Sequence, residues 1–395
     1  MPDKTLLEQQ ADALASNISG WEIRALRRIG KRIKQIGDLS MADLQSINNI
    51  ALVKGDLQEI LKELAKVTRL NVGQIRKMYG DVLTAQHQAN KPLYDYRGKQ
   101  FVPFDSNPQL QAIARAYALS TAGTMVNLSM TKMLCVYARN GQVVGLQKYY
   151  TDILDRAVME VASGTSDFHT AMRESIQELG GSGMRVDYGH GVTRRLDTVV
   201  RQNLLWGAKQ ASIEYNEMIG EELNADGYEI DWHRNPRPSH VFMQGRQFCA
   251  GKSKVIRGQL FPGMDDTRDT QSGENVTESL QDYGCLHFKT PIICGISVPR
   301  YTPEQLAKLN AQNEQKYRIG NGEYSGYEVT QMQRRLETEM RKQNVIKQLA
   351  QASGDKVTVR ACNANIRAMT DKYREISRMA GLSEELPRGT IVRKS

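Results

Sequence analysis

Apolar residues recur at helical spacing from Trp21 to about Gln86. Leu26, Ile29 and Ile33 fall on one face of a helix, at intervals of three and four residues. The other faces of that helix are strongly basic and carry Arg24, Arg27, Arg28, Lys31 and Arg32. Further short helices follow, and the pattern predicts an N-terminal basic helical module over residues 1–87.

Proline and glycine residues interrupt the helical pattern in the middle of the chain. Residues 88–109 hold three prolines among aromatic and polar side chains, which predicts a connector. Helical periodicity then returns, with a turn at Asn140 and Gly141, and it continues as far as residue 227. We therefore expect residues 110–227 to be helical.

The pattern changes again over residues 228–300, where short β-type runs alternate with Pro, Gly and Asp clusters. These runs predict a small β-containing lobe, which together with residues 110–227 forms a core over 110–300. Residues 301–395 return to helical spacing as a C-terminal basic arm, but their apolar stripes are thin and suggest burial against a partner chain. The predicted fold class is mainly α with a small β-containing insert (α+β), with helical N- and C-terminal arms.

The charge of the 395-residue chain is uneven. Its formal net charge is +9, and the excess of Lys and Arg lies in residues 1–100 and 300–395. Basic ends favour an acidic partner, either nucleic acid or an acidic protein surface. The alternative is that these residues are the ordinary solvated faces of amphipathic helices, because no block of five like charges occurs.

Cysteine usage and the absence of targeting signals indicate the compartment. Five cysteines at unpaired spacings predict synthesis in a reducing cytosol rather than a disulfide framework. The first residues lack the basic head and apolar core of a signal peptide. Residues 116–131 are uncharged, but they are short for a membrane span and rich in Ser, Thr and Gly, which favours a buried helix. We expect a soluble protein without a membrane partner.

Two distant segments, residues 231–249 and 282–288, concentrate chemically active side chains. Imidazole nitrogen and thiolate sulfur are preferred zinc ligands, so His240, Cys285 and His287 can supply three ligands. The candidates for a fourth ligand are His233, Cys249 and Asp231. The expected cofactor is none, or a structural zinc ion at this cluster.

The spacing of these residues leaves other interpretations open. No Cys-x-x-Cys pair is present, so the same side chains can form a hydrogen-bonded structural cluster without a metal. A third interpretation is a metal-dependent hydrolase or nuclease with Asp282 as its base. Nucleophilic catalysis would need Cys285 or Ser239 beside a histidine. No Walker motif or dinucleotide fingerprint occurs.

Three arginines of the first segment also have two interpretations. Arg234, Arg237 and Arg246 can grip a phosphate or carboxylate through paired N–H groups. Arginines among prolines and aromatic residues can equally stack on the rings and bind backbone carbonyls at a corner. We favour the corner.

Four ordered motifs suggest a family. In chain order, the first motif opens with VASGTSDFHTAMRESIQELGGSG, and the other three are HRNPRPSHVFMQGRQF, YGCLHFKTPIICGISVPRYTPEQL and YEVTQMQRRLETEMRK. In this order the chain resembles the phage minor capsid protein 2 family, relatives of the MuF-like phage head proteins. The resemblance runs from about Tyr149 to Lys342 and extends more weakly toward both ends.

The resemblance assigns individual residues to the family's motifs. Its "RPSH…QG…F" signature matches Arg237, Pro238, Ser239, His240, Gln244, Gly245 and Phe248, and its "C-x-H" element matches Cys285 and His287. The chain departs at Gly284 and Leu286, where the family usually has Asn and Arg. This departure weakens any ligand or anion role for that corner.

The resemblance implies a structural, non-enzymatic minor head protein of a tailed bacteriophage. Such a protein is made in the host cytoplasm and packaged in the virion, in the capsid interior or at the portal vertex, where it assists head assembly or genome ejection. Its expected partners are the portal protein and other head proteins, and packaged DNA is a further candidate. Arg24, Arg27, Arg28, Lys31 and Arg32 are the expected contact residues for DNA or portal, and a DNA-binding protein is the remaining alternative.

Overall fold

The computed structural model describes residues 6–37, 49–70, 72–130, 134–138, 140–162, 168–188, 192–282 and 285–386. The chain is about 65% helical, and several small antiparallel sheets accompany the helices. The predicted fold class, mainly α with a small β-containing insert, is therefore confirmed.

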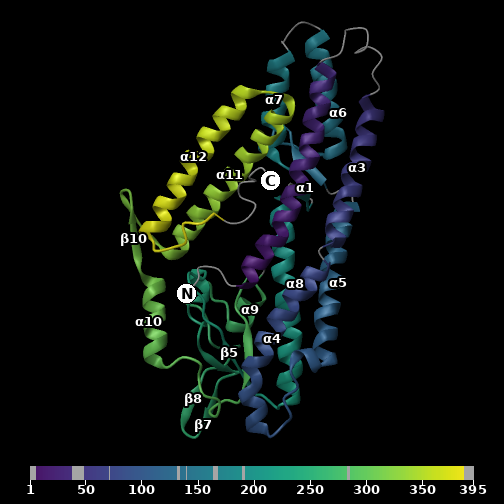
Figure 1. Cartoon of the computed structure of the whole chain (residues 1–395). Coiled ribbons are helices and arrows are strands. Elements are labelled where there is room, and N and C mark those ends of the chain that lie inside the picture. Colours follow the sequence, from purple (N-terminus) through teal and green to yellow (C-terminus); the bar gives the residue numbers. More distant parts are fainter. Residues whose placement is uncertain are drawn as a thin grey trace.

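The helices lie mostly along one direction, which makes the molecule elongated (Figure 1). They are α1 (Leu6–Gly37), α3 (Asn49–Leu70), α4 (Val72–Arg97), α5 (Pro108–Met130), α6 (Leu146–Ala162), α7 (Phe168–Ser182), α8 (Leu196–Glu222), α9 (Val276–Gln281), α10 (Pro303–Glu314), α11 (Gly326–Ser353) and α12 (Lys356–Met379), with 3₁₀ turns η1 (Phe104–Ser106) and η2 (Pro238–His240).

The strands are short and all pair antiparallel. They are β1 (Leu134–Tyr137), β2 (Val143–Gly145), β3 (Arg185–Asp187), β4 (Thr193–Arg195), β5 (Gly227–Ile230), β6 (Gln247–Cys249), β7 (Lys254–Ile256), β8 (Gln259–Phe261), β9 (Lys289–Ile292), β10 (Lys316–Ile319) and β11 (Gly322–Ser325). The sheets have the orders β2-β1-β3-β4 and β6-β5-β9, and β7-β8 and β10-β11 form hairpins.

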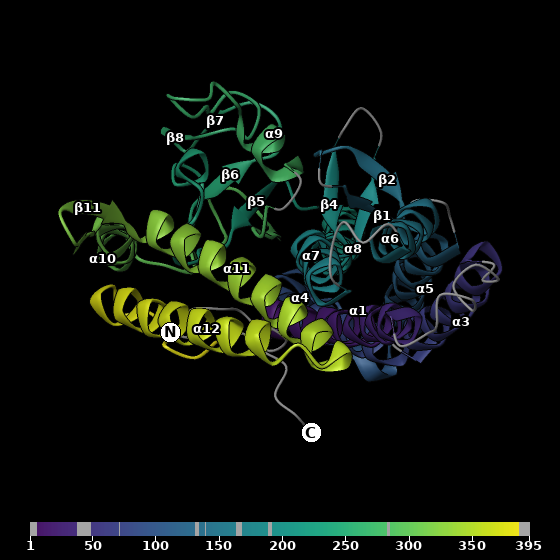
Figure 2. The same cartoon turned by 90° about the horizontal axis from the view of Figure 1, so that it is seen from above.

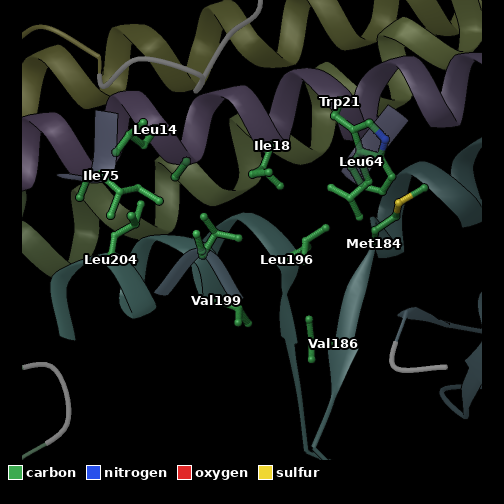
Figure 3. Close-up of a cluster of buried hydrophobic side chains, with 14 of the residues drawn as sticks. Leu14, Ile18, Trp21, Leu64, Ile75, Met184, Val186, Leu196, Val199 and Leu204 are labelled. Carbon is green, nitrogen blue, oxygen red and sulfur yellow. The ribbon is translucent and has the colours of Figure 1, made fainter. Parts of the chain in front are cut away.

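Helix α1 lies at the centre of the main hydrophobic core. Its residues Ile18, Trp21 and Leu26 are at most 1% exposed, and the Trp21 indole N–H donates to Ile60 O of α3 (3.0 Å). Full burial of a side chain of this size contributes about 1.5–3 kcal/mol. Figure 3 shows side chains of α1 meeting those of other elements: Leu14 lies near Ile75 of α4 and Leu204 of α8, and Trp21 lies near Leu64 of α3 and Met184.

One hydrophobic cluster runs from the first described helix to the last. It contains Leu7 of α1, Leu110 of α5, Leu204 of α8 and Cys362 of α12. Segments expected as an N-terminal module, a core and a C-terminal arm therefore share their buried surface. The division of the chain at residues 87, 109 and 300 stays a prediction.

Two secondary-structure predictions in the first half are wrong. Residues 88–97, expected to begin a connector, are the last turns of α4, and Pro92 lies inside the helix. The burial of Leu93 and Tyr94 in the core after Pro92 favours continuing the helix despite the lost backbone donor. Within the expected helical segment 110–227, strands β1 to β4 form a sheet, and the turn at Asn140 and Gly141 joins β1 to β2.

The second half matches the pattern more closely. The β lobe, defined here as residues 227–300, contains β5 to β9 and lies at one end of the molecule (Figure 1). The hairpin β10-β11 was not predicted within the C-terminal arm. The thin apolar stripes of α11 and α12 pack on each other, and α11 also packs on α1 and α7, so a partner chain is not needed to cover these faces.

Seen from above, α12 is the outermost helix of this pair, and the β lobe and the four-stranded sheet lie on the other side of α11 (Figure 2). The uncharged segment 116–131 falls mostly in α5, where Ala118, Thr121 and Ala122 are buried. Among the described residues, no helix combines the length and apolar character needed to cross a bilayer.

The junction of α4, α5 and α8 depends on a glycine. Tyr79 Oη donates to Leu204 O (3.0 Å) and lies 2.9 Å from Thr121 Oγ1 directly above Gly207. A Cβ at Gly207 would overlap both oxygens, because the side chains approach the bare backbone of α8.

We expect Gly207→Ala to lower the free energy of unfolding by about 1–3 kcal/mol, the usual cost of overpacking. The control is Gly123→Ala in α5, where a new Cβ has no neighbour within 4 Å and alanine favours the helix. Urea unfolding followed by circular dichroism compares the two variants. Equal stability of both would contradict the close approach of Tyr79 to α8.

Candidate functional site: a buried histidine and cysteine cluster

The β lobe brings the two chemically rich segments together. Strand β5 is central in its sheet, with β6 on one side and β9 on the other. The first segment leaves β5, forms η2, and turns at Gly245, whose N–H donates to Ile230 O (2.9 Å). The second segment follows α9 and enters β9. Both segments therefore adjoin the same strand.

Three of the expected ligand residues converge in the interior of the lobe. The exposed fractions of His240, Cys285 and His287 are 2%, 4% and 1%. One ligand atom of each residue lies within 4.8 Å of the other two, and Cys285 Sγ is 3.6 Å from His287 Nδ1. The distant Pro/His and Cys/His segments thus meet in space, as the sequence interpretation required.

Each histidine of the cluster has a polar partner on its outer side. The amide group of Gln244 lies 3.4 Å from His287 Nε2, and Asp282 Oδ2 lies 3.3 Å from His240 Nε2. Arg237 Nη1 donates to the same carboxylate oxygen (2.9 Å). These contacts orient both rings and leave Nδ1 of His287 facing the cysteine.

The three candidates for a fourth ligand occupy different places. The ring of His233 packs on that of His287, with centroids 4.1 Å apart, and its Nε2 is buried without a hydrogen-bond partner among the described residues. Asp231 Oδ1 accepts from the Phe288 N–H (2.7 Å) and so joins the two segments. Cys249, the last residue of β6, lies beside Cys294. His233 is therefore the candidate that packs on the cluster.

Burial keeps the imidazoles of the cluster uncharged. It lowers the pKa of His240, although the hydrogen bond that His240 donates to Asp282 opposes this, and it lowers the pKa of His287 well below the ordinary value. The positive charge of the nearby Lys209 ammonium adds to the effect at His287. Lys209 Nζ is itself buried and donates to the carbonyl oxygens of Leu280 and Cys285. Neutral imidazole is the form that binds a metal ion.

The arrangement suits a structural junction better than a reaction centre. All three side chains of the cluster are at least 96% buried, which leaves a substrate little access. Asp282, the expected base, is held by Arg237 and His240. No hydrogen bond joins Ser239 to a histidine within the described residues, so the hydroxyl lacks the activating base that nucleophilic catalysis needs.

The other motif residues build the corner around the cluster. Pro238 begins η2, and Phe248 is 1% exposed in the small core of the lobe. Gly245 has φ +69°, and a Cβ there would lie 2.5 Å from Leu306 Cδ1. Gly284 lies outside the described residues, while Leu286, where the family usually has Arg, packs against the main hydrophobic core.

The three arginines of the first segment make contacts within the chain. Arg234 donates to Ala380 O and Gly381 O beyond α12, and Arg246 donates to Phe242 O (2.9 Å). Arg237 pairs with Asp282 (2.9 Å). These contacts agree with the expected corner rather than with an open anion site.

Comparison with known families settles the relationship of the chain. A family model for phage minor capsid protein 2 matches residues 3–376. The chain belongs to the phage minor capsid protein 2 family. No curated protein and no solved structure matches it. Membership identifies a structural protein of the bacteriophage virion, and the expected family is confirmed.

In this minor capsid protein, most of the expected contact arginines of α1 are engaged internally. Arg24 and Arg28 pair with Glu63 of α3 (3.9 and 3.4 Å), and Arg32 makes two hydrogen bonds to Asp56 (3.0 and 3.1 Å). Arg27 and Lys31 are exposed, and no ion pair involves either within the described part of the chain. A DNA or portal contact at these two residues stays a prediction.

The sequence analysis missed a second basic surface of the minor capsid protein. Arg360, Arg367 and Arg374, which we call the arginine stripe, lie on the exposed side of α12. No ion pair to any of them occurs among the described residues. Their seven-residue spacing is two helical turns, and it was the signal that could have shown they share a face.

The corner motif predicts a specific effect at Gly245. We expect Gly245→Ala to destabilise the protein by about 2–4 kcal/mol, because a left-handed backbone costs about 1–2 kcal/mol for alanine and the contact with Leu306 adds an overpacking cost. Gly258→Ala is the matched control, since Gly258 has φ +78° and no neighbour within 4 Å. Chemical unfolding of both variants isolates the contact. The same loss in each would show that Leu306 does not confine the corner.

Proposed function

We propose that this minor capsid protein is a non-enzymatic component of the portal vertex, where it acts in head assembly or genome ejection. The observation that carries the proposal is the arginine stripe on α12. Exposed arginines that form no ion pair among the described residues favour an acidic partner surface, and they raise the rate of association with it.

The position of α12 supports a contact with a partner. Its buried residues Cys362, Ile366, Tyr373 and Ile376 face the rest of the protein. The opposite side is exposed, and α12 lies outside α11 in the view from above (Figure 2). Successive arginines of the stripe are about 10 Å apart along the axis, since an α-helix rises 1.5 Å per residue. The stripe can therefore meet a partner along roughly 20 Å of helix.

The composition of this face favours a protein over DNA. Ala361, Ala364 and Ala368 are exposed between the arginines, and small side chains allow a partner's backbone to approach. Asp371 and Glu375 are exposed on the same helix. Carboxylates there would repel DNA phosphates but are compatible with a mixed-charge protein surface. Among the expected partners, the portal protein fits this face best.

The test reverses the stripe with Arg360→Glu, Arg367→Glu and Arg374→Glu in one chain. We expect binding to the cognate portal protein, measured by biolayer interferometry, to weaken at least tenfold, and wild-type binding to weaken as salt rises. The triple variant should keep its circular dichroism spectrum because all three side chains are exposed.

The matched control places the same three charge reversals elsewhere, as Lys62→Glu, Lys66→Glu and Arg76→Glu on exposed positions of α3 and α4. It should bind the portal protein like the wild type. Unchanged portal binding by the stripe variant would refute the proposed contact. A gel shift of DNA that fades steeply with salt and is lost in Arg27→Glu/Lys31→Glu would instead favour the DNA-binding alternative.

A further inference from the structure

The buried cluster of the β lobe lies beside a ring nitrogen, His233 Nε2, that is buried without a hydrogen-bond partner among the described residues. We propose that His240, Cys285 and His287 bind a structural zinc ion, with His233 as the fourth ligand. This site is separate from the arginine stripe, so either proposal can fail without the other.

The distances fit a tetrahedral ion. With zinc–nitrogen bonds of about 2.0–2.1 Å and a zinc–sulfur bond of about 2.3 Å, neighbouring ligand atoms lie about 3.3–3.6 Å apart. Cys285 Sγ and His287 Nδ1 are 3.6 Å apart. The ligand atoms of all three residues lie within 4.8 Å of one another, so a small rotation of the side chains closes the shell.

The proposed fourth ligand is a nitrogen without a hydrogen-bond partner. His233 Nε2 is buried and has no hydrogen-bond partner among the described residues, although the ring packs on His287. A buried polar atom without a partner costs about 1–3 kcal/mol. Coordination of zinc removes this cost, whereas a purely hydrogen-bonded cluster leaves it in place.

The outer partners of the cluster are those that metal-binding histidines usually have. A ligating imidazole donates its other ring N–H to a carboxylate or another acceptor, which fixes the tautomer and raises the basicity of the ligand. Asp282 stands in this position at the outer nitrogen of His240, and Arg237 holds Asp282 in turn.

The chemistry of the set selects zinc over hard cations. Imidazole and thiolate favour zinc, whereas magnesium and calcium prefer oxygen ligands. On binding, the Cys285 thiol loses one proton to solvent and its sulfur coordinates the ion. The thiolate offsets one of the two positive charges that zinc brings into the lobe.

The small size of the lobe gives the ion a structural role. The hydrophobic cluster of the lobe comprises the buried residues Ile230, Met243, Phe248, Met264, Val276, Leu280 and Cys285. A core of this size supplies little stability by itself, and natural small domains are commonly reinforced by a structural metal. His240 lies in η2, and Cys285 and His287 lie just before β9. An ion bound to all three would therefore link these two segments of the lobe.

The test measures metal in the purified full-length protein. We expect about one zinc per chain by inductively coupled plasma mass spectrometry, a lower melting temperature after chelation, and recovery when zinc alone is added back. Cobalt substitution should give the visible spectrum of a tetrahedral site with a thiolate-to-cobalt charge-transfer band. Both signals come from the wild-type chain and do not depend on the folding of a variant.

Variants then assign the ligands. Cys285→Ser should lose the charge-transfer band, whereas Cys294→Ser, which changes a buried thiol of the same lobe outside the cluster, should keep it. His233→Gln should weaken zinc affinity by 10-fold or more, and unchanged affinity would remove His233 from the shell. Less than a tenth of an equivalent of zinc after incubation with excess metal, together with a melting temperature that chelation does not change, would overturn the site.

Discussion

Helix α1 packs on several other helices at the same time, and the rest of the structure depends on this central packing. One side packs on α8 and another on α11, so the N-terminal helix joins the middle of the chain to its C-terminal arm. Buried charges reinforce the junction: Arg195 pairs with Glu22 of α1 and Asp197 of α8, and Asp197 also pairs with Arg341 of α11. Burial works against ionisation of Asp197, yet Arg195 and Arg341 hold its pKa below the ordinary value. Removing one partner would leave an uncompensated buried charge, which is strongly destabilising.

This central packing determines which parts of the minor capsid protein are available for other roles. The helices around α1 use their apolar faces on one another, whereas the β lobe is attached mainly where β9 meets α4 and α8. The lobe must therefore close on itself with a small core of its own. That explains why its polar residues are so completely buried: hydrogen bonds and the His240, Cys285 and His287 cluster perform a closing role that a larger apolar core would perform elsewhere.

Sequence patterns predicted the local features and missed those that depend on distant contacts. The spacing of Leu26 and Ile29 predicted a helix, and both side chains are fully buried. The Pro, Gly and Asp clusters predicted the β lobe, and the convergence of His240 with His287 followed from treating two unusual segments as one site. Strands β2 to β4 have three residues each, too few for alternation to be detected. Likewise, Tyr94 is buried by tertiary packing, which no local pattern around Pro92 reveals.

The same limitation affects how basic residues are interpreted. A cluster of cations on α1 indicated a contact surface, but Arg32 is held by Asp56, which also accepts a hydrogen bond from the buried Tyr150 (2.8 Å). To contact DNA or another protein, this arginine would have to give up two hydrogen bonds and leave a largely buried carboxylate without its cation. The free energy lost in this way is comparable to the free energy gained from the new contact. The arginines of the stripe on α12 carry no such cost, because none of them forms an ion pair among the described residues, whereas Arg378 of the same helix pairs with Glu384 (2.8 Å). The net charge of +9 therefore says less about partners than the location of cations that form no ion pair among the described residues, and the arginine stripe of α12 is one such group.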